Sequence, residues 1–274
     1  MARSSATAPH GILKFNVKKG ISLMLPHKTW ANGYDRVYEL SFGALLERLT
    51  IATVNQVEKR FPPPARIVDF GAGTGRIALP LAYKGYPVVA VDACLEMLDE
   101  IPENRNIEKF VGRMQDFHTE KAFDMAICVY TVISYIVDED SIQKSFDAVQ
   151  KALKVGGLFL LDIPSKGLFN NFYVKNREMD RRVTITLDER DLYQYSEKTT
   201  LFDEDEPLSF EDSFKIRYWD PEYLISILSR NFCLKEDLTS AFIGSGGKYL
   251  LFKKMDKNCG VRLYLTASST LVKH

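Results

Sequence analysis

The sequence lacks an excess of charge of either sign, because its 274 residues contain 36 Lys and Arg and 36 Asp and Glu. A chain without net positive charge has no overall field to attract nucleic acid, whose binding depends on Lys and Arg that neutralise phosphates. A local basic patch remains in the N-terminal part, at Lys14, Lys18, Lys19 and Lys28. This patch lacks interleaved aromatic residues, so we do not expect nucleic acid as a partner.

Cysteines are few, and their spacing gives no support for a zinc site. Cys94, Cys128, Cys233 and Cys259 form no Cys-x-x-Cys pair and lie near no histidine cluster. Cys94 and Cys128 stand in apolar surroundings, as reduced thiols in the core of a cytosolic protein do. No apolar run approaches the roughly 18 residues that span a bilayer, and the opening residues lack the apolar core of a signal peptide. We therefore expect a cytoplasmic protein without membrane contact.

Composition and periodicity divide the chain into parts. A helical pattern runs from about Tyr38 to Lys59 and ends before the triple proline at 62–64, which no helix can continue. After it, short apolar runs alternate with helical stretches, a pattern typical of βαβ units and of a parallel sheet covered on both faces. We therefore expect an N-terminal helical segment (1–64), an α/β core (65–164 and 220–255), an insertion (165–219) and a tail (256–274).

The insertion is rich in aromatic residues and alternates polar with apolar residues, which predicts antiparallel strands. It also contains many more carboxylates than cations. These carboxylates fit solvated turns and edge strands, or alternatively a field that favours cationic substrates. Both interpretations concern Asp188, Glu189, Asp191, Glu197, Asp203, Glu204, Asp205, Glu206, Glu211 and Asp212.

The strongest functional signal is the segment DFGAGTG at 69–75, which follows an apolar strand and precedes a helical pattern. Alternating glycines let the backbone turn tightly and approach a ligand, and the start of a helix offers free N–H groups. The spacing excludes the dinucleotide fingerprint, because Arg76 stands where that motif needs Gly or Ala. An acid at the strand end would repel a pyrophosphate but favour a zwitterionic or cationic ligand. The candidate ligand-binding residues here are Asp69, Gly71, Ala72, Gly73 and Gly75.

Two further acids follow the next predicted strands. Asp92 ends the strand PVVAV, where a carboxylate can accept hydrogen bonds from both hydroxyls of a ribose. Asp116 follows the third strand and could accept a hydrogen bond from an exocyclic adenine amine. A single acid of this kind often caps a helix or a turn. Three acids at successive strand ends beside a glycine loop, however, predict a nucleoside site.

These motifs resemble the class I S-adenosylmethionine-dependent methyltransferases, through VDFGAGTG, VVAVD, GRMQDF, FDMAICVYTVISYI and KALKVGGLFLLD. The resemblance implies S-adenosylmethionine as cofactor. It also implies a Rossmann-like α/β fold, with a seven-stranded, mostly parallel sheet, the last strand antiparallel, and an antiparallel aromatic cap inserted. Asp92 would bind ribose, Asp116 would meet adenine, and Met97 would pack on the adenine ring, although a core methionine fits the same position. The main chain of Cys128 would lie near the cofactor's amino group. Ala93 and Gln115, beside the two acids, complete the expected cofactor site.

A finer resemblance points to small-molecule N-methyltransferases of the glycine N-methyltransferase-like and amino-sugar N,N-dimethyltransferase types. It rests on YDRVY at 34–38, YTVISY at 130–135 and GSGGK at 244–248. It implies that Tyr34 lies over the methionine end of the cofactor and Tyr135 near the substrate, although simple packing would also explain both. The Asn/Asp-Pro-Pro-Tyr/Phe motif of amino-adenine methyltransferases is absent, and so is the Pro-Cys nucleophile of cytosine C5 chemistry.

We therefore predict an enzyme that transfers a methyl group from S-adenosylmethionine to a small molecule, with an amine as the first acceptor to test. Tyr34, Tyr130 and Tyr135 would shape the pocket, no metal would be needed, and no single side chain would be an essential base. Residues 1–64 would cover the cofactor, and the cap strands would bind the acceptor or form a homodimer. The alternatives are an O-methyltransferase of a small hydroxylated metabolite, an RNA or nucleotide methyltransferase, and a non-catalytic cofactor-binding protein.

Overall fold

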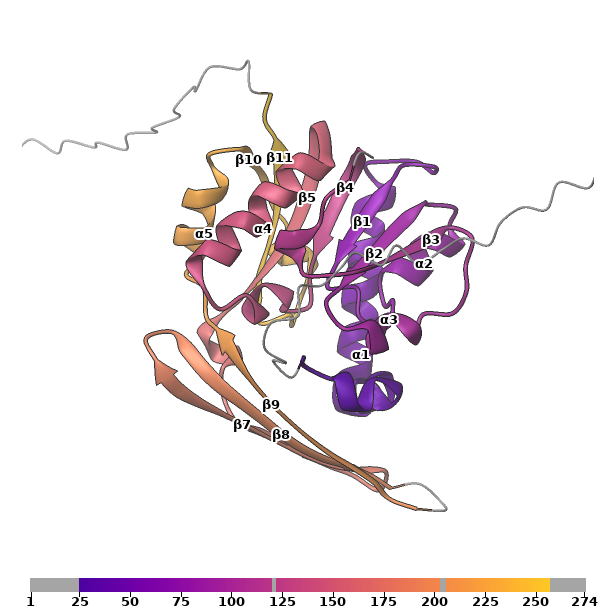
Figure 1. Cartoon of the computed structure of the whole chain (residues 1–274), viewed down its shortest axis with the longest axis vertical. Helices are drawn as coiled ribbons and strands as arrows, with labels where there is room; N and C mark the ends of the chain where they lie inside the picture. Colours follow the sequence, from indigo (N-terminus) through magenta and orange to yellow (C-terminus); the bar gives the residue numbers. More distant parts are fainter. Residues whose placement is uncertain (1–24, 120–121, 203–205, 257–274) are drawn as a thin grey trace, which may run out of the picture.

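A seven-stranded sheet forms the centre of the computed structural model, which describes residues 25–119, 122–202 and 206–256 (Figure 1). The strand order is β10-β11-β5-β4-β1-β2-β3. Neighbouring strands are parallel from β5 to β3, whereas β11 runs antiparallel to both β5 and β10. The predicted sheet, with its last strand antiparallel, is confirmed. Its strands are β1 (Ile67–Phe70), β2 (Val88–Asp92), β3 (Ile107–Val111), β4 (Phe123–Cys128), β5 (Leu153–Pro164), β10 (Phe232–Asp237) and β11 (Gly247–Lys254).

Helices cover both faces of this sheet because the side chains of each central strand alternate between two cores. On β4, Ala126 and Cys128 pack with α4 and α5, whereas Met125 and Ile127 pack with α1, α2 and α3. Asp138 caps α4 by accepting the N–H of Ser141 at 2.7 Å. The helices are α1 (Ala31–Glu58), α2 (Ala78–Tyr83), α3 (Leu95–Asp99), α4 (Glu139–Ala152) and α5 (Pro221–Leu228), with short 3-10 turns η1 (Lys28–Trp30), η2 (Met114–Asp116), η3 (Val132–Tyr135), η4 (Lys166–Leu168) and η5 (Thr239–Ala241). Within the described ranges, no helix is both long and apolar enough to cross a membrane.

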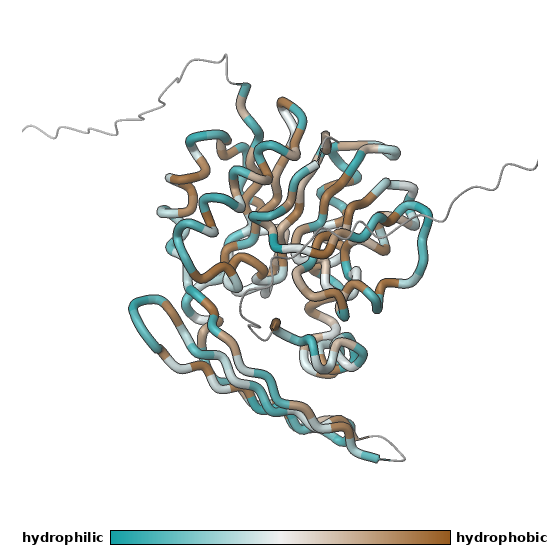
Figure 2. The backbone as a smooth tube through the Cα atoms, viewed as in Figure 1, coloured by the Kyte–Doolittle hydropathy of each residue, from teal (hydrophilic) through white to brown (hydrophobic). Residues whose placement is uncertain are grey.

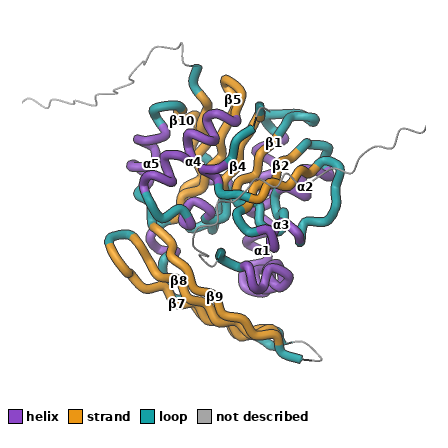
Figure 3. The backbone as a smooth tube through the Cα atoms, viewed as in Figure 1, coloured by secondary structure: helices purple, strands orange, loops and turns teal. Residues whose placement is uncertain are grey.

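A second, four-stranded sheet projects from the first as a long antiparallel arm, which we call the cap (Figures 1 and 3). Along β8, Tyr195, Glu197, Thr199 and Leu201 are buried, whereas the residues between them are more exposed. This alternation, visible as alternating colours along the arm in Figure 2, shows that one face of the cap packs against the protein. The strands are β6 (Phe172–Lys175), β7 (Met179–Glu189), β8 (Leu192–Leu201) and β9 (Leu208–Arg217), in that order.

Helix α1 joins the two sheets, and it begins seven residues earlier than the sequence pattern predicts. Its first turns pack Val37 with Met179, Leu201 and Phe210 of the cap, while its last turns pack Val57 on the central sheet. The extra turns are stabilised by this contact with a distant part of the chain, which no local period could reveal. The expected basic patch lies mostly outside the described residues, and Lys28 forms an ion pair with Glu96 at 3.3 Å.

A buried ion pair connects α1 to the inner face of the cap. Arg181 on β7 donates to Glu197 on β8 at 2.8 and 3.1 Å, and neither side chain is more than 1% exposed. Arg181 also donates to Ser41 Oγ on α1 at 2.9 Å and lies over the ring of Tyr38. Because an unpaired charge in such surroundings is costly, these contacts hold the helix and the cap together.

Candidate active site

A cavity of about 800 Å³ lies between the carboxyl-terminal edge of the parallel strands, the first half of α1 and the cap. Its walls come from the loops after β1, β2, β3 and β4, from α1, and from β8 and β9. Segments that are far apart in the sequence therefore meet around this cavity. Ten of the residues predicted for the site line it, namely Tyr34, Gly71, Ala72, Gly73, Asp92, Ala93, Met97, Gln115, Tyr130 and Tyr135.

The glycine loop after β1 adopts a backbone that requires glycine. Gly71 has φ 72°, and a Cβ atom added to it would lie 2.3 Å from Cγ2 of Val132. The loop is held by hydrogen bonds from the N–H groups of Gly71 and Ala72 to the carbonyl of Val91 on β2, at 2.8 and 3.0 Å. The absent side chain thus leaves space at the edge of the cavity, where a ligand can approach the main chain.

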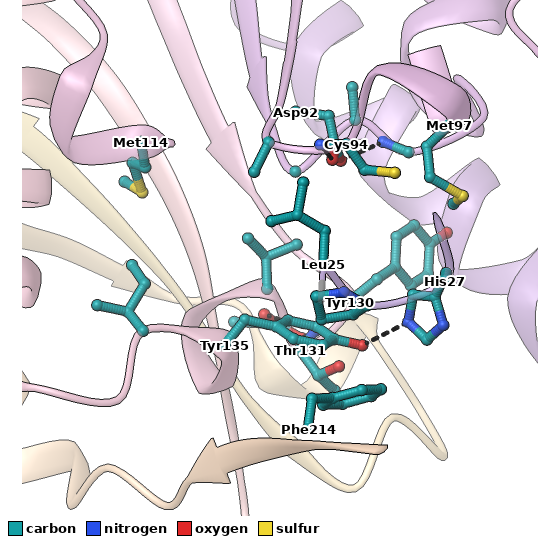
Figure 4. A pocket seen from close by; sticks show the side chains of 18 of the residues that line it. Leu25, His27, Asp92, Cys94, Met97, Met114, Tyr130, Thr131, Tyr135 and Phe214 are labelled. Atoms are coloured by element: carbon teal, nitrogen blue, oxygen red, sulfur yellow. Dashed lines mark hydrogen bonds between the residues drawn. The ribbon is translucent and has the colours of Figure 1, made fainter. Parts of the chain in front are cut away.

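Asp92 is fixed at the end of β2 by two backbone hydrogen bonds. Its Oδ2 accepts the N–H of Gly73 and its Oδ1 accepts the N–H of Cys94, both at 2.9 Å (Figure 4). Burial raises the pKa of Asp92, and these two hydrogen bonds oppose that rise. Each carboxylate oxygen has two lone pairs, so both oxygens can still accept a hydrogen bond from a ligand.

Four predicted cofactor residues do not reach the cavity wall. Asp69 is buried behind the glycine loop, where burial and the nearby charge of Asp92 raise its pKa to about 8. Cys128 is fully buried in the core, and Gly75 packs against Ile101. Asp116 is exposed on η2, whereas its neighbour Gln115 lines the cavity. The side chain of Asp116 therefore does not reach the cavity wall, where the predicted adenine contact would have to lie.

The three tyrosines line the same cavity, where Tyr34 packs beside Cys94 and Met97 and Tyr135 packs beside Phe214 of β9. The hydroxyl of Tyr130 lies 2.6 Å from Oγ1 of Thr50 on α1, and burial raises the pKa of Tyr130 to about 12. Burial also raises the pKa values of Tyr34 and Tyr135 well above the ordinary value. All three are therefore neutral phenols near pH 7, able to donate hydrogen bonds and to pack against a ligand.

The turn after β4, which also lines the cavity, is strained. Tyr130 and Thr131 both have φ 63°, a left-handed conformation that is rare for residues other than glycine. Asp162 on β5 holds the turn by accepting the N–H of Thr131 at 3.0 Å. Burial raises the pKa of Asp162 to about 7, and its side chain lines the cavity. Such strain is characteristic of functional sites, where the surrounding contacts hold it in place.

The sequence did not indicate His27 or Asp162 as site residues, but both line the cavity. One feature of the sequence could have identified Asp162, because it is an acid inside the apolar run of β5. His27 had none, since it precedes α1 without any motif. Its ring lies beside Tyr135, and its Nε2 is 3.0 Å from the Tyr135 hydroxyl (Figure 4).

The carboxylates of the cap divide into two groups. Asp188, Asp191 and Glu211 form ion pairs with lysines at the surface, as solvated turns and strand edges do. Glu197 and Asp212 are instead buried on the inner face. Three of the predicted acids, at 203–205, lie outside the described residues.

Comparison with protein families shows which known proteins this part of the chain resembles. Residues 67–157 match the family described as a methyltransferase domain (Methyltransf_25). The match contains the glycine loop, Asp92 and the strained turn after β4. This segment therefore matches a methyltransferase domain, and the central sheet has the Rossmann-like methyltransferase fold that the sequence predicted. The match also supports S-adenosylmethionine as the cofactor.

Curated relatives are similar over the same part of the chain. A provisionally assigned methyltransferase of Geobacillus sp. (strain WCH70) is 30% identical over 105 residues, 36% of this chain and 42% of that protein. The glycine/sarcosine N-methyltransferase of Aphanothece halophytica is 27% identical over 104 residues, 35% of this chain and 39% of that protein. The chain matches between about two fifths and about half of the length of such relatives.

Solved structures extend the similarity of fold beyond this segment. An S-adenosylmethionine-dependent methyltransferase from Clostridium acetobutylicum ATCC 824 has a TM-score of 0.71 at 19% identity, covering 82% of this chain and 99% of that one. The sugar N-methyltransferase KedS8 from Streptoalloteichus sp ATCC 53650 has a TM-score of 0.64 at 18% identity, covering 90% of this chain and all of that one. At these identities the likeness concerns the fold.

Proposed function

We propose that this chain binds S-adenosylmethionine in the cavity and transfers its methyl group to an amine of a small molecule. The observation that carries the proposal is that a single cavity is lined by the glycine loop and Asp92, by the three tyrosines, and by residues of β8 and β9. Cofactor and acceptor could therefore meet in one continuous cavity. The cavity volume is in the range of small-molecule sites, and the similarity to a glycine/sarcosine N-methyltransferase agrees with an amine acceptor.

The residues at the cofactor end fit S-adenosylmethionine. The space that a Cβ on Gly71 would fill lets a ligand lie against the loop. Asp92 retains one acceptor position on each oxygen for the two ribose hydroxyls. Met97 provides apolar surface beside Asp92 for the adenine ring. Arg76 also lines the cavity, and its guanidinium, which pairs with Asp35 at 3.0 Å, has further N–H groups for the carboxylate of the cofactor.

When bound, S-adenosylmethionine supplies a methyl group that its sulfonium already activates. The protein then has to align the acceptor with that methyl group and exclude water, effects that together contribute on the order of 7 kcal/mol or more. Tyr34 from α1 and Tyr130 and Tyr135 from the turn after β4 surround the acceptor end. As neutral phenols they orient an acceptor through hydrogen bonds without repelling its lone pair.

The acidic groups at the acceptor end favour an amine over a hydroxyl. Asp162 lines the cavity there, and Asp212 lies directly behind His27. A protonated amine gains from nearby carboxylates, and it becomes a nucleophile only after it loses a proton. An alcohol binds as a neutral group and gains no charge–charge attraction from these carboxylates.

The test combines binding with an acceptor screen. Calorimetry should show binding of S-adenosylmethionine and none of NAD, and a labelled methyl donor should label amines in a pool of small metabolites. Labelling of hydroxyl compounds alone would make the protein an O-methyltransferase, and salt-sensitive labelling of RNA would make it a nucleic-acid enzyme. Binding without any transfer would leave a cofactor-binding protein, and absence of binding would refute the proposal.

The cap has a proposed role in binding the acceptor, because Gln194, Phe214 and Lys215 on β8 and β9 line the cavity. We also propose that its outer strands pair in a homodimer. Among the described strands, β6 and β9 lie at the edges of the sheet, and Tyr173 on β6 is half exposed. Sedimentation of the full chain measures this directly, and a monomer at micromolar concentration would contradict it.

A further inference from the structure

His27 forms a bridge between the acceptor end of the cavity and a buried carboxylate. Its Nε2 lies 3.0 Å from the hydroxyl of Tyr135, which lines the cavity. On its other side, Nδ1 lies 3.4 Å from Oδ2 of Asp212 on β9. The imidazole is almost completely buried, and the residue has φ 65°. Asn, Asp and His are the side chains that tolerate this left-handed conformation best.

Asp212 is held as an anion that faces the histidine. Its Oδ2 accepts the main-chain N–H of His27 at 2.6 Å and the indole N–H of Trp30 at 3.3 Å. Burial alone would raise the pKa of Asp212, but the side chain and main-chain N–H of His27 and the indole N–H of Trp30 hold it below the ordinary value. Nδ1 makes no hydrogen bond to any described residue, but the carboxylate 3.4 Å away attracts a proton on Nδ1, which leaves Nε2 as the nitrogen that can accept a proton from Tyr135.

Among the groups around the imidazole of His27, Asp212 is the main charged group that acts on it. Tyr34 and Tyr38 of α1 lie against the ring with centroids 5.1 and 6.4 Å away, and both remain neutral because burial raises their pKa values. Asp92 at the other end of the cavity adds a weaker attraction for a positive imidazole. Lys28, next in sequence, is paired with Glu96, and Lys215 of β9 is paired with Asp188.

Tyr135 has to give up its own hydroxyl proton when it accepts a proton from the amine. Its pKa lies well above the ordinary value, first because of burial and then because of the nearby Tyr38, Tyr195, Glu197 and Asp212. A phenol in this state can pass a proton only if it receives one as it gives one away. The acceptor for the outgoing proton has to be within hydrogen-bond distance, and Nε2 of His27 meets that requirement.

We infer that Tyr135 and His27 form a proton relay that deprotonates the amine acceptor, with Asp212 as the positioning residue that stabilises the imidazolium. The inference rests on the proposed function. An N–H bond of the ammonium breaks, its proton moves to the Tyr135 oxygen, and the hydroxyl proton moves to His27 Nε2. The freed lone pair then forms the N–C bond as the S–C bond breaks. After the product leaves, the imidazolium returns its proton through Tyr135 to water in the cavity. Because an amine also loses its proton in alkaline solution, the relay accelerates the reaction at neutral pH without being essential.

The first test compares pH profiles of methyl transfer, using the amine that wild type labels in the metabolite screen. His27→Asn introduces a residue that tolerates the positive φ, and Tyr135→Phe keeps the aromatic ring, so both variants should fold. Each should lose about 100-fold in kcat/KM at pH 7 and recover most of the loss near pH 10. His118→Gln, which changes an exposed histidine outside the cavity, is the matched control and should follow wild type. Profiles of the two relay variants that run parallel to wild type at every pH would overturn the inference.

The second test is chemical rescue. His27→Gly suits the positive φ, removes the imidazole and leaves a space that free imidazole can enter. Added imidazole should restore at least a tenth of the wild-type rate at pH 7 in His27→Gly and should have no effect on Tyr135→Phe. No rescue in a variant that still binds S-adenosylmethionine would contradict the relay. If wild type binds the cofactor but methylates no amine, the proposed function itself fails, which is a different outcome from parallel profiles or absent rescue in an active enzyme.

Discussion

Asp92 at the end of β2 accepts the main-chain N–H of Gly73 at 2.9 Å, so that the acid and the glycine loop after β1 are fixed relative to each other. The carboxylate therefore has two tasks: it holds the loop and it faces the ligand. We predict that Asp92→Ala lowers the affinity for S-adenosylmethionine at least 100-fold in calorimetry. Asp99→Ala, which removes an exposed acid at the end of α3, is the control and should bind like wild type. Equal affinities would show that Asp92 does not contact the cofactor.

Gly71 is the residue of the loop at which a side chain is least tolerated. An added Cβ would overlap with Val132, and the positive φ costs roughly a further 1 kcal/mol for a non-glycine residue. Gly71→Ala should therefore be destabilised by about 2–4 kcal/mol in urea unfolding and bind the cofactor weakly. Gly43→Ala, in the middle of α1, meets only the flexible side chain of Glu39 and should be neutral or slightly stabilising. Unchanged stability of Gly71→Ala would mean that the loop has another conformation.

The buried acid Asp69 predicts a pH dependence of stability with a definite sign. Its pKa is about 8 in the folded chain, because of burial and of Asp92, against about 4 when unfolded. The folded state thus holds the proton more tightly, and this contribution is complete below pH 4 and is lost as the pH rises through 8. Asp69→Asn cannot ionise, so its stability relative to wild type should grow across that window by several kcal/mol.

Urea unfolding at pH 5 and pH 8.5, without cofactor, measures the effect. Asp99→Asn is the matched exposed control, and its difference from wild type should stay constant between the two pH values. A constant difference for Asp69→Asn as well would show that Asp69 ionises as easily in the folded chain as in the unfolded one.

The buried pair of Arg181 and Glu197 should matter far more for stability than the surface pairs of the cap. Glu197→Gln leaves the guanidinium charge without a counter-ion between aromatic rings, which should cost about 3–5 kcal/mol. The matched surface substitution is Glu211→Gln, which breaks an exposed pair with Lys198 on the neighbouring strand. Thermal unfolding should show a large fall in Tm for the first variant and none for the second. Similar small effects in both would mean that water reaches Arg181.

Much of the site could be predicted because its signals are local. The spacing of strand, glycine loop and helix identifies Gly71 and Gly73, and the acid at the next strand end identifies Asp92. Local signals could not show which of Gln115 and Asp116 faces the cavity, because the tight turn η2 determines the direction of each side chain. The contact between His27 and Asp212 joins residues 185 positions apart, and a single histidine without a motif gives no sign of it.

The way the cap enters the chain has a consequence for engineering. It is inserted at one point, between β5 and α5, so its strands could be exchanged for those of a related enzyme without reordering the central sheet. Such a graft would fail if limited to the insertion, because Arg181 bonds to Ser41 and Asp212 bonds to His27. The transferable unit is therefore discontinuous and consists of the cap together with residues 25–58. Acceptor preference should move from one scaffold to another only when both segments move together.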